Sequence, residues 1–488
     1  MNPSRRWLSA PALALSLALV GAACSGGSSG DSGRSSGGDL PPCPVDALDE
    51  ATGTTEVVLW YQISGKAEQT LKAMVEDYNA SHSKVRVRAE VQGTSYDQLL
   101  RAYERAIPSG DLPTIVVAED TATQFLIDSG TVLQAQACFD AAGLDTDGFS
   151  EAVVNHFTTD GGMWPGTASI SDLLTYVNKN HLRRAGLDPE VAPQTLADVR
   201  TMAEQIKAAG VVDTPVVLRM DSWLVETQLT GSKQPIVNND NGYGSGETTE
   251  ATFDTDTTRE IFEWVEDMVA DGLLLPTQAT DGNIDHYLAM VNQRASMTIE
   301  TSTAATTIES FLGGDRSVVG DRPEAAQADE LDTSGLDIGA APVFGVDAAG
   351  RAQIGGNGFF ITTSGTDVQK AAAWDFITWW NAEPQQVRWH VEGSYLPFLT
   401  SAASTPEVQT FWDTTLAGGF LKIAYDELTQ NVDPNFSGAL IGPYDQFRVA
   451  MRDALGRVAF QGADPAAAIT EAKTRTDEAL TRYNDANF

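Results

Sequence analysis

Histidines and cysteines, the side chains best suited to catalysis and metal binding, are few in this 488-residue chain. None of the five histidines has the spacing of a metal-binding motif such as H-E-x-x-H. The sequence has no phosphate-binding G-x-x-x-x-G-K-[ST] loop, and no nucleophile elbow outside a low-complexity tract near the N-terminus. Carboxylates are abundant, but nothing in the sequence singles out an acid–base pair. We therefore expect a protein that is not an enzyme and has no cofactor or bound metal.

Cys24 ends a segment that is organised like a secretory signal. Arg5 and Arg6 precede an apolar run, small residues follow it, and a Ser/Gly-rich tract begins at Ser25. The apolar run is shorter than the ~20 residues that a membrane-spanning helix needs. A cysteine at the first mature position is typical of bacterial lipoproteins. We expect cleavage after residues 1–23 and a lipid on Cys24 that anchors the protein to the outer face of the cell membrane; the alternative is an ordinary signal with an incidental cysteine.

Lipidation of Cys24 would leave two cysteines, Cys43 and Cys138, in an oxidising compartment. We predict a disulfide between them, which would attach the segment before the first strand to the body of the protein. Two buried free thiols are the alternative. The residues of 24–52 are rich in Gly, Ser and Asp, so we expect a flexible tether there.

The chain is strongly acidic, which excludes one class of partner. It has 31 Lys and Arg against 67 Asp and Glu, for a formal net charge of −36; removal of Arg5 and Arg6 with the signal changes this to −38. Nucleic-acid binding depends on neutralising phosphates, so nucleic acid is excluded. Docking on anionic lipid head groups is also disfavoured. An anionic ligand would need a local cationic site that overcomes this field.

Strand and helix patterns alternate from the start of the body. Residues 57–60 form a buried-strand run, and 85–91 alternate apolar and polar residues as a half-buried strand does. Residues 67–78 and 99–107 have apolar positions at helical spacing, and 115–118 predict another strand. This β-α-β-α-β start predicts an α/β fold.

The same alternation returns later in the chain. Thr195 and Asp198 have the spacing of a reciprocal helix cap. The later predicted strands are 173–177 and 216–218, and the later predicted helices are 196–206, 262–269, 368–379 and 465–483. We expect at least two α/β lobes.

Several short segments, taken in order, resemble one family. They are Leu59 to Gly65, Tyr78 to Ala80, Gly93 to Tyr96, Gly110 to Pro113, Tyr176 to Lys179, Ala185 to Pro189, Ala295 to Thr298, Ile354 to Gly356, Gly393 to Pro397 and Phe447 to Val449. They resemble segments of the extracellular solute-binding proteins of ABC importers, family 1. The resemblance spans about 55–485 and is closest to receptors for glycerol-3-phosphate or a glycerophosphodiester.

The resemblance implies a set of ligand-binding residues. They are Tyr96, Asp120, Ser171, Trp223, Ser302, Gly356, Tyr395 and Arg448. Asp120 stands where the family has a Glu, and Glu119 is beside it. A phosphate needs a guanidinium fork, hydroxyl donors and backbone N–H groups, which Arg448 and its partners would supply. Each residue also has a structural alternative: Arg448 as a surface ion pair, the two tyrosines as core aromatics, and Gly356 as a turn residue.

The resemblance also implies an architecture and a mechanism. Two lobes, joined by strands that cross more than once, would close on a ligand held between them. We expect the first lobe at 53–166 and 296–356, and the second at 167–295 and 357–486. The closed monomer would dock on an ABC permease. Its lipid anchor would hold it to the membrane in which that permease lies.

Four functions remain open from the sequence. The leading hypothesis is a receptor for glycerol-3-phosphate or a glycerophosphodiester, and the second is a mono- or oligosaccharide receptor of the same family. A secreted hydrolase and a structural envelope lipoprotein are the alternatives from other classes. An Arg448→Ala variant would separate the first two, because only a phosphate depends on the guanidinium.

Overall fold

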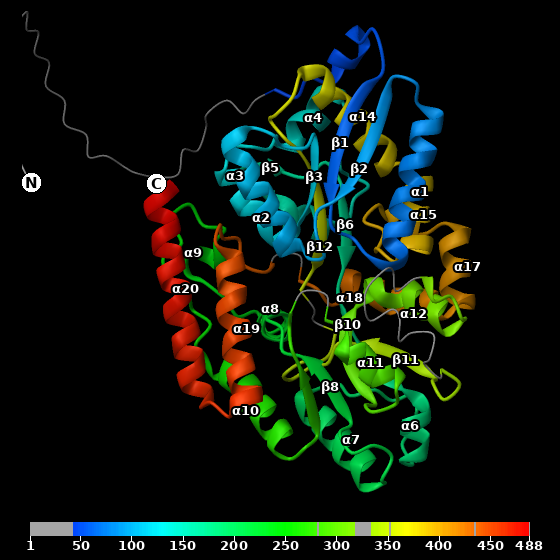
Figure 1. Ribbon diagram of the computed structural model, residues 1–488, viewed down its shortest axis with the longest axis vertical. Coiled ribbons are helices and arrows are strands. Elements are labelled where there is room, and N and C mark those ends of the chain that lie inside the picture. The colour runs from blue at the N-terminus through cyan, green and yellow to red at the C-terminus, as the bar shows by residue number, and fades with distance from the viewer. Residues whose placement is uncertain (1–41, 281–282, 318–332, 351–352, 434–435, 488) are drawn as a thin grey trace, which may run out of the picture.

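The chain forms two five-stranded sheets, one above the other in Figure 1. The computed structural model describes residues 42–280, 283–317, 333–350, 353–433 and 436–487. The predicted signal, Cys24 and the tether up to residue 41 lie outside these residues, so lipidation stays a prediction. Among the described residues, no helix is both long enough and apolar enough to cross a membrane.

The first sheet has the strand order β2-β1-β3-β12-β6. Its strands are β1 (Thr55–Tyr61), β2 (Val85–Val91), β3 (Ile115–Glu119), β6 (Ala168–Ser171) and β12 (Gly355–Ile361). β1 pairs in parallel with β2 and β3, whereas β12 is antiparallel to β3 and β6. Its helices are α1 (Gly65–Ser81), α2 (Tyr96–Ala106), α3 (Thr123–Asp128), α4 (Ala135–Ala142), α5 (Glu151–Phe157), α14 (Asp367–Asn381), α15 (Glu383–Gly393), α16 (Thr400–Ala403) and α17 (Pro406–Thr414).

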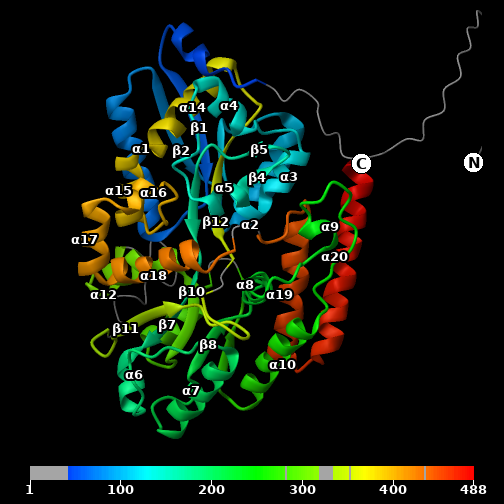
Figure 2. The same cartoon turned by 180° about the vertical axis from the view of Figure 1, so that it is seen from behind.

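The second sheet has the order β11-β7-β10-β8-β9. Its strands are β7 (Leu173–Asn178), β8 (Val216–Arg219), β9 (Leu274–Thr277), β10 (Met297–Thr301) and β11 (Ile338–Pro342). Its helices are α6 (Lys179–Arg184), α7 (Leu196–Ala208), α8 (Trp223–Gly231), α9 (Asn238–Asn241), α10 (Asp256–Ala270), α11 (Asp285–Val291), α19 (Tyr444–Gln461) and α20 (Pro465–Asn487). Figure 2 shows α19 and α20 side by side along one flank, where both pack on α10.

The remaining elements connect or edge these two units. α12 (Ala305–Leu312) and α18 (Leu416–Gln430) pack on each other, and α18 also packs on β11. A small hairpin is formed by β4 (Thr158–Thr159) and β5 (Gly162–Met163). Short 3₁₀ turns are η1 (Val45–Glu50), η2 (Ile107–Ser109), η3 (Asp120–Ala122) and η4 (Ser302–Ala304).

Local sequence patterns account for many of these elements. β2 alternates buried and exposed residues over its first half, as its apolar–polar alternation predicts. α7 begins at Thr195, whose side chain accepts from the Asp198 N–H, while the Asp198 carboxylate accepts from the Thr195 N–H. This reciprocal cap confirms the predicted start of that helix.

The predicted disulfide is confirmed, and it shortens the predicted tether. Cys43 and Cys138 are bonded with an S–S distance of 1.98 Å. Val45 and Leu48 of η1 pack against the core, and η1 lies on α14. The prediction of a flexible tether to residue 52 is therefore wrong for its last part, because the disulfide and these two apolar side chains attach it to the first sheet's unit.

The division of the later chain between the two units also needs correction. We predicted 296–356 in the first lobe and 357–486 in the second. Instead β10 and β11 pair with β7 in the second sheet, and β12 pairs with β3 in the first. α14 packs on β1 and β12, in the first unit. Strand pairing between distant segments decides this division, and the order along the chain does not reveal it.

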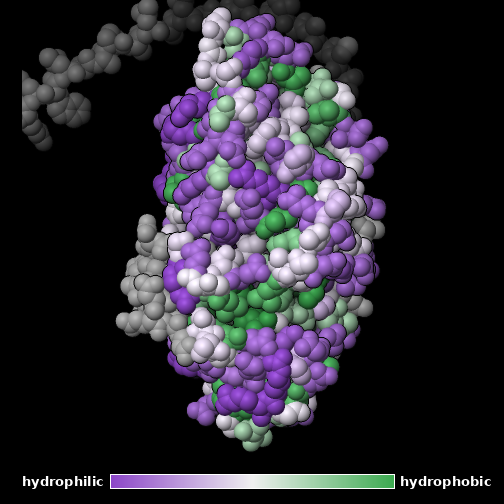
Figure 3. Space-filling view, turned by 90° about the vertical axis from the view of Figure 1, so that its right-hand side faces the viewer, coloured by the Kyte–Doolittle hydropathy of each residue, from purple (hydrophilic) through white to green (hydrophobic). Residues whose placement is uncertain are grey.

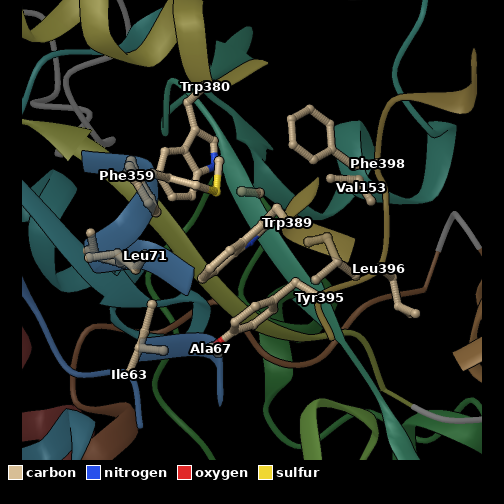
Figure 4. Close-up of a cluster of buried hydrophobic side chains, with 14 of the residues drawn as sticks. Ile63, Ala67, Leu71, Val153, Phe359, Trp380, Trp389, Tyr395, Leu396 and Phe398 are labelled. Atoms are coloured by element: carbon tan, nitrogen blue, oxygen red, sulfur yellow. The ribbon is translucent and has the colours of Figure 1, made fainter. Parts of the chain in front are cut away.

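An aromatic cluster lies in the core of the first unit. We define it as Trp380, Trp389, His390, Tyr395 and Trp412, all of which are buried. Figure 4 shows the rings of Trp389 and Tyr395 face to face, with centroids 4.9 Å apart. The surface is mainly hydrophilic on the face in Figure 3, where hydrophobic residues gather near the middle.

Candidate functional site

Two cavities that share wall residues lie between the two units, and we call them together the cleft. The larger has a volume of about 280 Å³ and the smaller about 20 Å³. Leu173, Trp223 and Arg448 line both cavities. The wall of the larger cavity includes Tyr96, Asp97 and Glu119 from the first unit and Arg219, Asp221, His286, Tyr287 and Glu300 from the second.

The ends of strands position the polar wall residues. Glu119 ends β3 and Ser171 ends β6 in the first sheet, while Arg219 ends β8 in the second. Trp223 is the first residue of α8, directly after the turn that follows β8. In α/β sheets, ligands bind beyond the carboxyl ends of strands, because side chains from several loops converge there.

Arg448, on α19, joins the two units through carboxylates. Its Nε lies 3.0 Å from Oε1 of Glu226, its Nη2 3.0 Å from Oε2 of Glu226, and its Nη1 2.8 Å from Oε1 of Glu119. The Tyr444 hydroxyl donates to Glu226 as well, at 2.9 Å. Burial raises the pKa of Glu119, and Arg448 only partly offsets this. The guanidinium is thus bound on two sides by this protein's own acids.

Asp120 also has a partner within the chain. Its Oδ2 lies 3.0 Å from Nε2 of His156, and both side chains are almost fully buried. The carboxylate lines the smaller cavity beside Ser171. It can accept a hydrogen bond from a ligand hydroxyl while His156 fixes its orientation.

The second unit contributes two polar pairs to the larger cavity. Arg219 contacts Asp221 at 3.0 Å, and Nε2 of His286 lies 2.6 Å from Oε2 of Glu300. Burial acts to raise the pKa of Glu300, but the hydrogen bonds from His286 and the Thr301 N–H, together with the charge of Arg219, outweigh it and lower the pKa. Arg452, four residues after Arg448 on α19, contacts Asp97 across the cleft at 3.1 Å.

The described cleft wall carries more negative than positive charge. Its acids are Asp97, Glu119, Asp120, Asp172, Asp221, Glu226 and Glu300, and its arginines are Arg219, Arg448 and Arg452. Each of the three arginines is bonded to at least one of these acids. The cleft therefore offers acceptors for hydroxyl groups, together with aromatic surface from Trp223, Tyr96 and Tyr287.

The structure brings together five of the eight predicted ligand-binding residues. Tyr96, Asp120, Ser171, Trp223 and Arg448 line the cleft. In the described part of the chain, Ser302, Gly356 and Tyr395 do not belong to the wall of either cavity.

Ser302 and Gly356 both have structural roles outside the cleft wall. Ser302 is fully buried, its Oγ accepts from the Asp172 N–H at 3.3 Å, and its own N–H donates to the Asp172 carbonyl. Gly356 has φ 130°, and a Cβ there would lie 1.9 Å from the Ser169 carbonyl oxygen. Only glycine allows β12 to approach β6 so closely.

Tyr395 is a core aromatic, as the structural alternative proposed. It is 6% exposed and stacks on Trp389. Its hydroxyl accepts from Nδ2 of Asn357 at 3.3 Å, and the same amide donates to the Tyr96 hydroxyl at 2.9 Å. Tyr395 thus reaches the cleft through its contacts with Asn357 and with Tyr96, which lines the wall.

The sequence reasoning missed several wall residues. Glu226 lies three positions after Trp223, so a helix prediction over 223–231 would have placed both on one face. Asp172 follows the predicted Ser171 directly. For Arg219, His286 and Glu300 we find no sequence signal, because only the pairing of the second sheet brings them together.

Comparison with known proteins decides the family. The family model of the bacterial extracellular solute-binding proteins matches residues 73–415. The chain belongs to this family. A curated relative, the sn-glycerol-3-phosphate-binding periplasmic protein UgpB of Yersinia pestis, is 22% identical over 444 residues, which cover 90% of this chain and 95% of the relative.

Solved structures of this family share the two-lobed fold. The cyclic α-maltosyl-1,6-maltose-binding protein of Arthrobacter globiformis matches with a TM-score of 0.65 and 20% identity, covering 88% of this chain and 100% of that one. UgpB of Mycobacterium tuberculosis, solved with glycerophosphocholine, matches with a TM-score of 0.68 and 16% identity at the same coverage. These matches confirm the predicted α/β fold, and the family model confirms the predicted solute-binding family. The relatives and the fold are those of ABC-transporter substrate-binding proteins, not enzymes.

Proposed function

We propose that this solute-binding protein captures a neutral carbohydrate, a mono- or oligosaccharide, between its two lobes and delivers it to an ABC permease. The observation that carries the proposal is the engagement of Arg448 by Glu119 and Glu226. A phosphate would have to displace one of these acids and then sit beside it. Two like charges 4 Å apart repel by about 4 kcal/mol at an effective dielectric constant of 20.

The chemistry of the cleft suits a sugar. Carboxylates accept hydrogen bonds from hydroxyl groups, and an aromatic face such as that of Trp223 packs against the apolar face of a sugar ring. Several similar solved structures are of sugar receptors, among them an acarbose receptor and maltose-binding proteins. Closure of the lobes on the ligand would present the form that docks on the permease.

Glycerol-3-phosphate or a glycerophosphodiester is the second candidate. The curated relatives that cover 90% of this chain are named for glycerol-3-phosphate binding, and this favours it. Five of the eight residues carried over from such receptors line the cleft. The carboxylates on either side of Arg448 count against it.

Location and anchoring remain part of the proposal. The relatives are periplasmic. A lipid on Cys24 would hold this protein, as a monomer, at the outer face of the cell membrane close to its permease. Replacing Cys24 with Ser should release the protein from the membrane fraction without changing its affinity for its ligand.

Titration calorimetry with the purified protein tests the ligand class. The panel would contain neutral sugars, including maltose, trehalose and cellobiose, with glycerol-3-phosphate and glycerophosphocholine. We expect a neutral sugar to bind with an affinity that does not change between low and high salt, because no net charge is screened. Tighter binding of either phosphate ligand, weakened by salt, would contradict the proposal and favour the second candidate.

A further inference from the structure

Asp172 is the residue at which the chain passes from the first sheet to the second. It follows Ser171, the last residue of β6, and precedes Leu173, the first residue of β7. Two hydrogen bonds with Ser302 hold its backbone: its N–H donates to Oγ at 3.3 Å, and its carbonyl accepts from the Ser302 N–H at 2.8 Å. The backbone from which its carboxylate projects is therefore fixed at the crossing.

The carboxylate of Asp172 is buried without a partner. The residue is 4% exposed, and neither carboxylate oxygen has a hydrogen-bond partner among the described residues. It lines the smaller cavity together with Ser171, Trp223, Gly355 and Arg448. A buried carboxylate without a donor is costly, and a cavity of about 20 Å³ can hold one water-sized polar group. The missing donor must come from whatever enters the cavity.

Glu427 is a second buried carboxyl, and it interacts electrostatically with Asp172. This residue of α18 is 1% exposed; its Oε1 accepts from the Val343 N–H at 3.1 Å, and its Oε2 has no partner in the described parts of the chain. Burial and then repulsion from Asp172 raise the pKa of Glu427, and burial raises that of Asp172. Arg448, the cation in the described wall of this cavity, is already bound by Glu119 and Glu226.

We propose that Asp172 is a ligand-contacting residue that selects hydroxyl or ammonium donors, with Glu427 near it making the same place unfavourable for a phosphate. This inference rests on the proposed function as a carbohydrate receptor, and it names Asp172 as the residue that sets which ligands the receptor prefers. A hydrogen bond from a ligand hydroxyl would satisfy the carboxylate, and an ammonium group would also neutralise it. Because Asp172 sits at the crossing between the sheets, the ligand would contact both units through it.

Titration calorimetry on Asp172→Asn tests this role. The probes are the tightest neutral sugar of the panel and the matched set glucose, glucosamine and glucose 6-phosphate. The Asp172→Asn variant should bind the neutral sugar about tenfold or more weakly, since it loses a charge-assisted hydrogen bond. In the wild type glucosamine should bind more tightly than glucose, and glucose 6-phosphate more weakly than both; the variant should reduce these differences. Glu407→Gln removes a charge from the exposed face of α17 and serves as the matched control, with unchanged affinities.

A second measurement needs no ligand. Burial raises the pKa of both carboxyls, so at pH 7 the empty protein must on folding either bind a proton or bury a charge, and an amide avoids this cost. Asp172→Asn and Glu427→Gln should therefore each raise Tm by about 2 °C or more at pH 7. A lower Tm for Asp172→Asn with unchanged sugar affinity would overturn the inference and make Asp172 a structural residue.

The two proposals fail in different ways. If a neutral sugar binds the wild type and Asp172→Asn equally well, the selective role of Asp172 is wrong and the carbohydrate receptor stands. If the wild type binds glycerol-3-phosphate more tightly than every sugar, the carbohydrate receptor is wrong. Exclusion of phosphate by Asp172 and Glu427 then fails with it.

Discussion

The aromatic cluster and the cleft both contain buried polar groups, but they differ in how those groups are satisfied. In the cluster, the Trp412 indole N–H donates to Nε2 of His390 at 2.7 Å, and Nδ1 of His390 lies 2.9 Å from the Tyr395 carbonyl oxygen. The Trp389 indole N–H donates to Oγ of Ser169, whereas the buried Trp380 indole N–H has no partner in the described part of the chain. In the cleft, the Asp172 carboxylate has no partner among the described residues, and carboxylates outnumber arginines.

An unpartnered polar group on a cavity wall differs from one inside a packed core, because a ligand can reach only the first. A satisfied buried network stabilises one arrangement and gains nothing from a ligand. A buried acceptor that lacks a donor destabilises the empty protein, and a ligand that supplies the donor removes that cost. Tyr395 and Arg448, which the resemblance assigned to the ligand, are each hydrogen-bonded within the chain, so neither marks a binding site by lacking a partner. The carboxylate of Asp172, on the cavity wall and without a partner among the described residues, does.

Breaking the ion pairs of Arg448 should have the largest effect on stability. Arg448→Met leaves Glu119 and Glu226 buried without their cation, so we expect the free energy of unfolding at pH 7 to fall by about 3–5 kcal/mol. The pKa of Glu119 is already raised, and a carboxyl with a raised pKa favours the folded state at low pH and loses this contribution as pH rises. The loss should therefore shrink between pH 7 and pH 5 in guanidinium chloride unfolding.

The double variant Arg448→Met with Glu226→Gln is the control for this prediction. It removes one of the two stranded charges, so it should be more stable than Arg448→Met alone. If Arg448→Met is as stable as the wild type at pH 7, the contrast between the regions is weaker than we describe. Loss of binding in such a variant would then report a ligand contact directly.

The cluster should show its own dependence on pH, in the acid range. Burial lowers the pKa of His390 to about 4 from 6.5. The folded protein then binds fewer protons than the unfolded chain between these values, so stability is lost as pH falls from 6.5 toward 4, by up to about 3 kcal/mol. Unfolding by guanidinium chloride at pH 7, 5.5 and 4.5 measures it.

His390→Gln provides the comparison for that measurement. The variant has no imidazole to protonate, so the stability difference between it and the wild type should decrease as pH falls below 6.5. A constant difference across the range would show that His390 does not carry the acid sensitivity. For Arg448→Met the difference from the wild type also shrinks as pH falls, but for the opposite reason: there the variant regains stability, whereas here the wild type loses it.

The smallest expected effect comes from a hydroxyl in the cluster. Tyr395→Phe keeps the stack on Trp389 and removes an acceptor for the Asn357 amide, so it should cost about 1 kcal/mol of stability. Ligand affinity should stay unchanged, whereas Tyr96→Phe, in the cleft wall, should weaken binding. Loss of affinity in Tyr395→Phe, measured by calorimetry, would return Tyr395 to the ligand-binding set.

Much of the fold was predictable, because local patterns specify individual elements. Three local patterns each predicted an element where the structure has it: the alternation over 85–91, the Thr195 cap and the helical spacing over 67–78. The disulfide was predictable because Cys43 and Cys138 are the only pair left once Cys24 is assigned to the predicted signal. Assignment of β12 to the first sheet failed, since its partner β3 lies more than 200 residues earlier in the chain.

The sequence by itself determined the α/β class, the acidic character, the disulfide and, through its resemblance, the solute-binding family. Five of the eight ligand-binding residues that the resemblance implied line the cleft. Only the tertiary structure decided that Arg448 is bound by two acids, that Tyr395 is buried against Trp389, and that the Asp172 carboxylate has no partner among the described residues. The physical reason is that charge pairing and burial depend on side chains that are distant in sequence and close only in the folded chain.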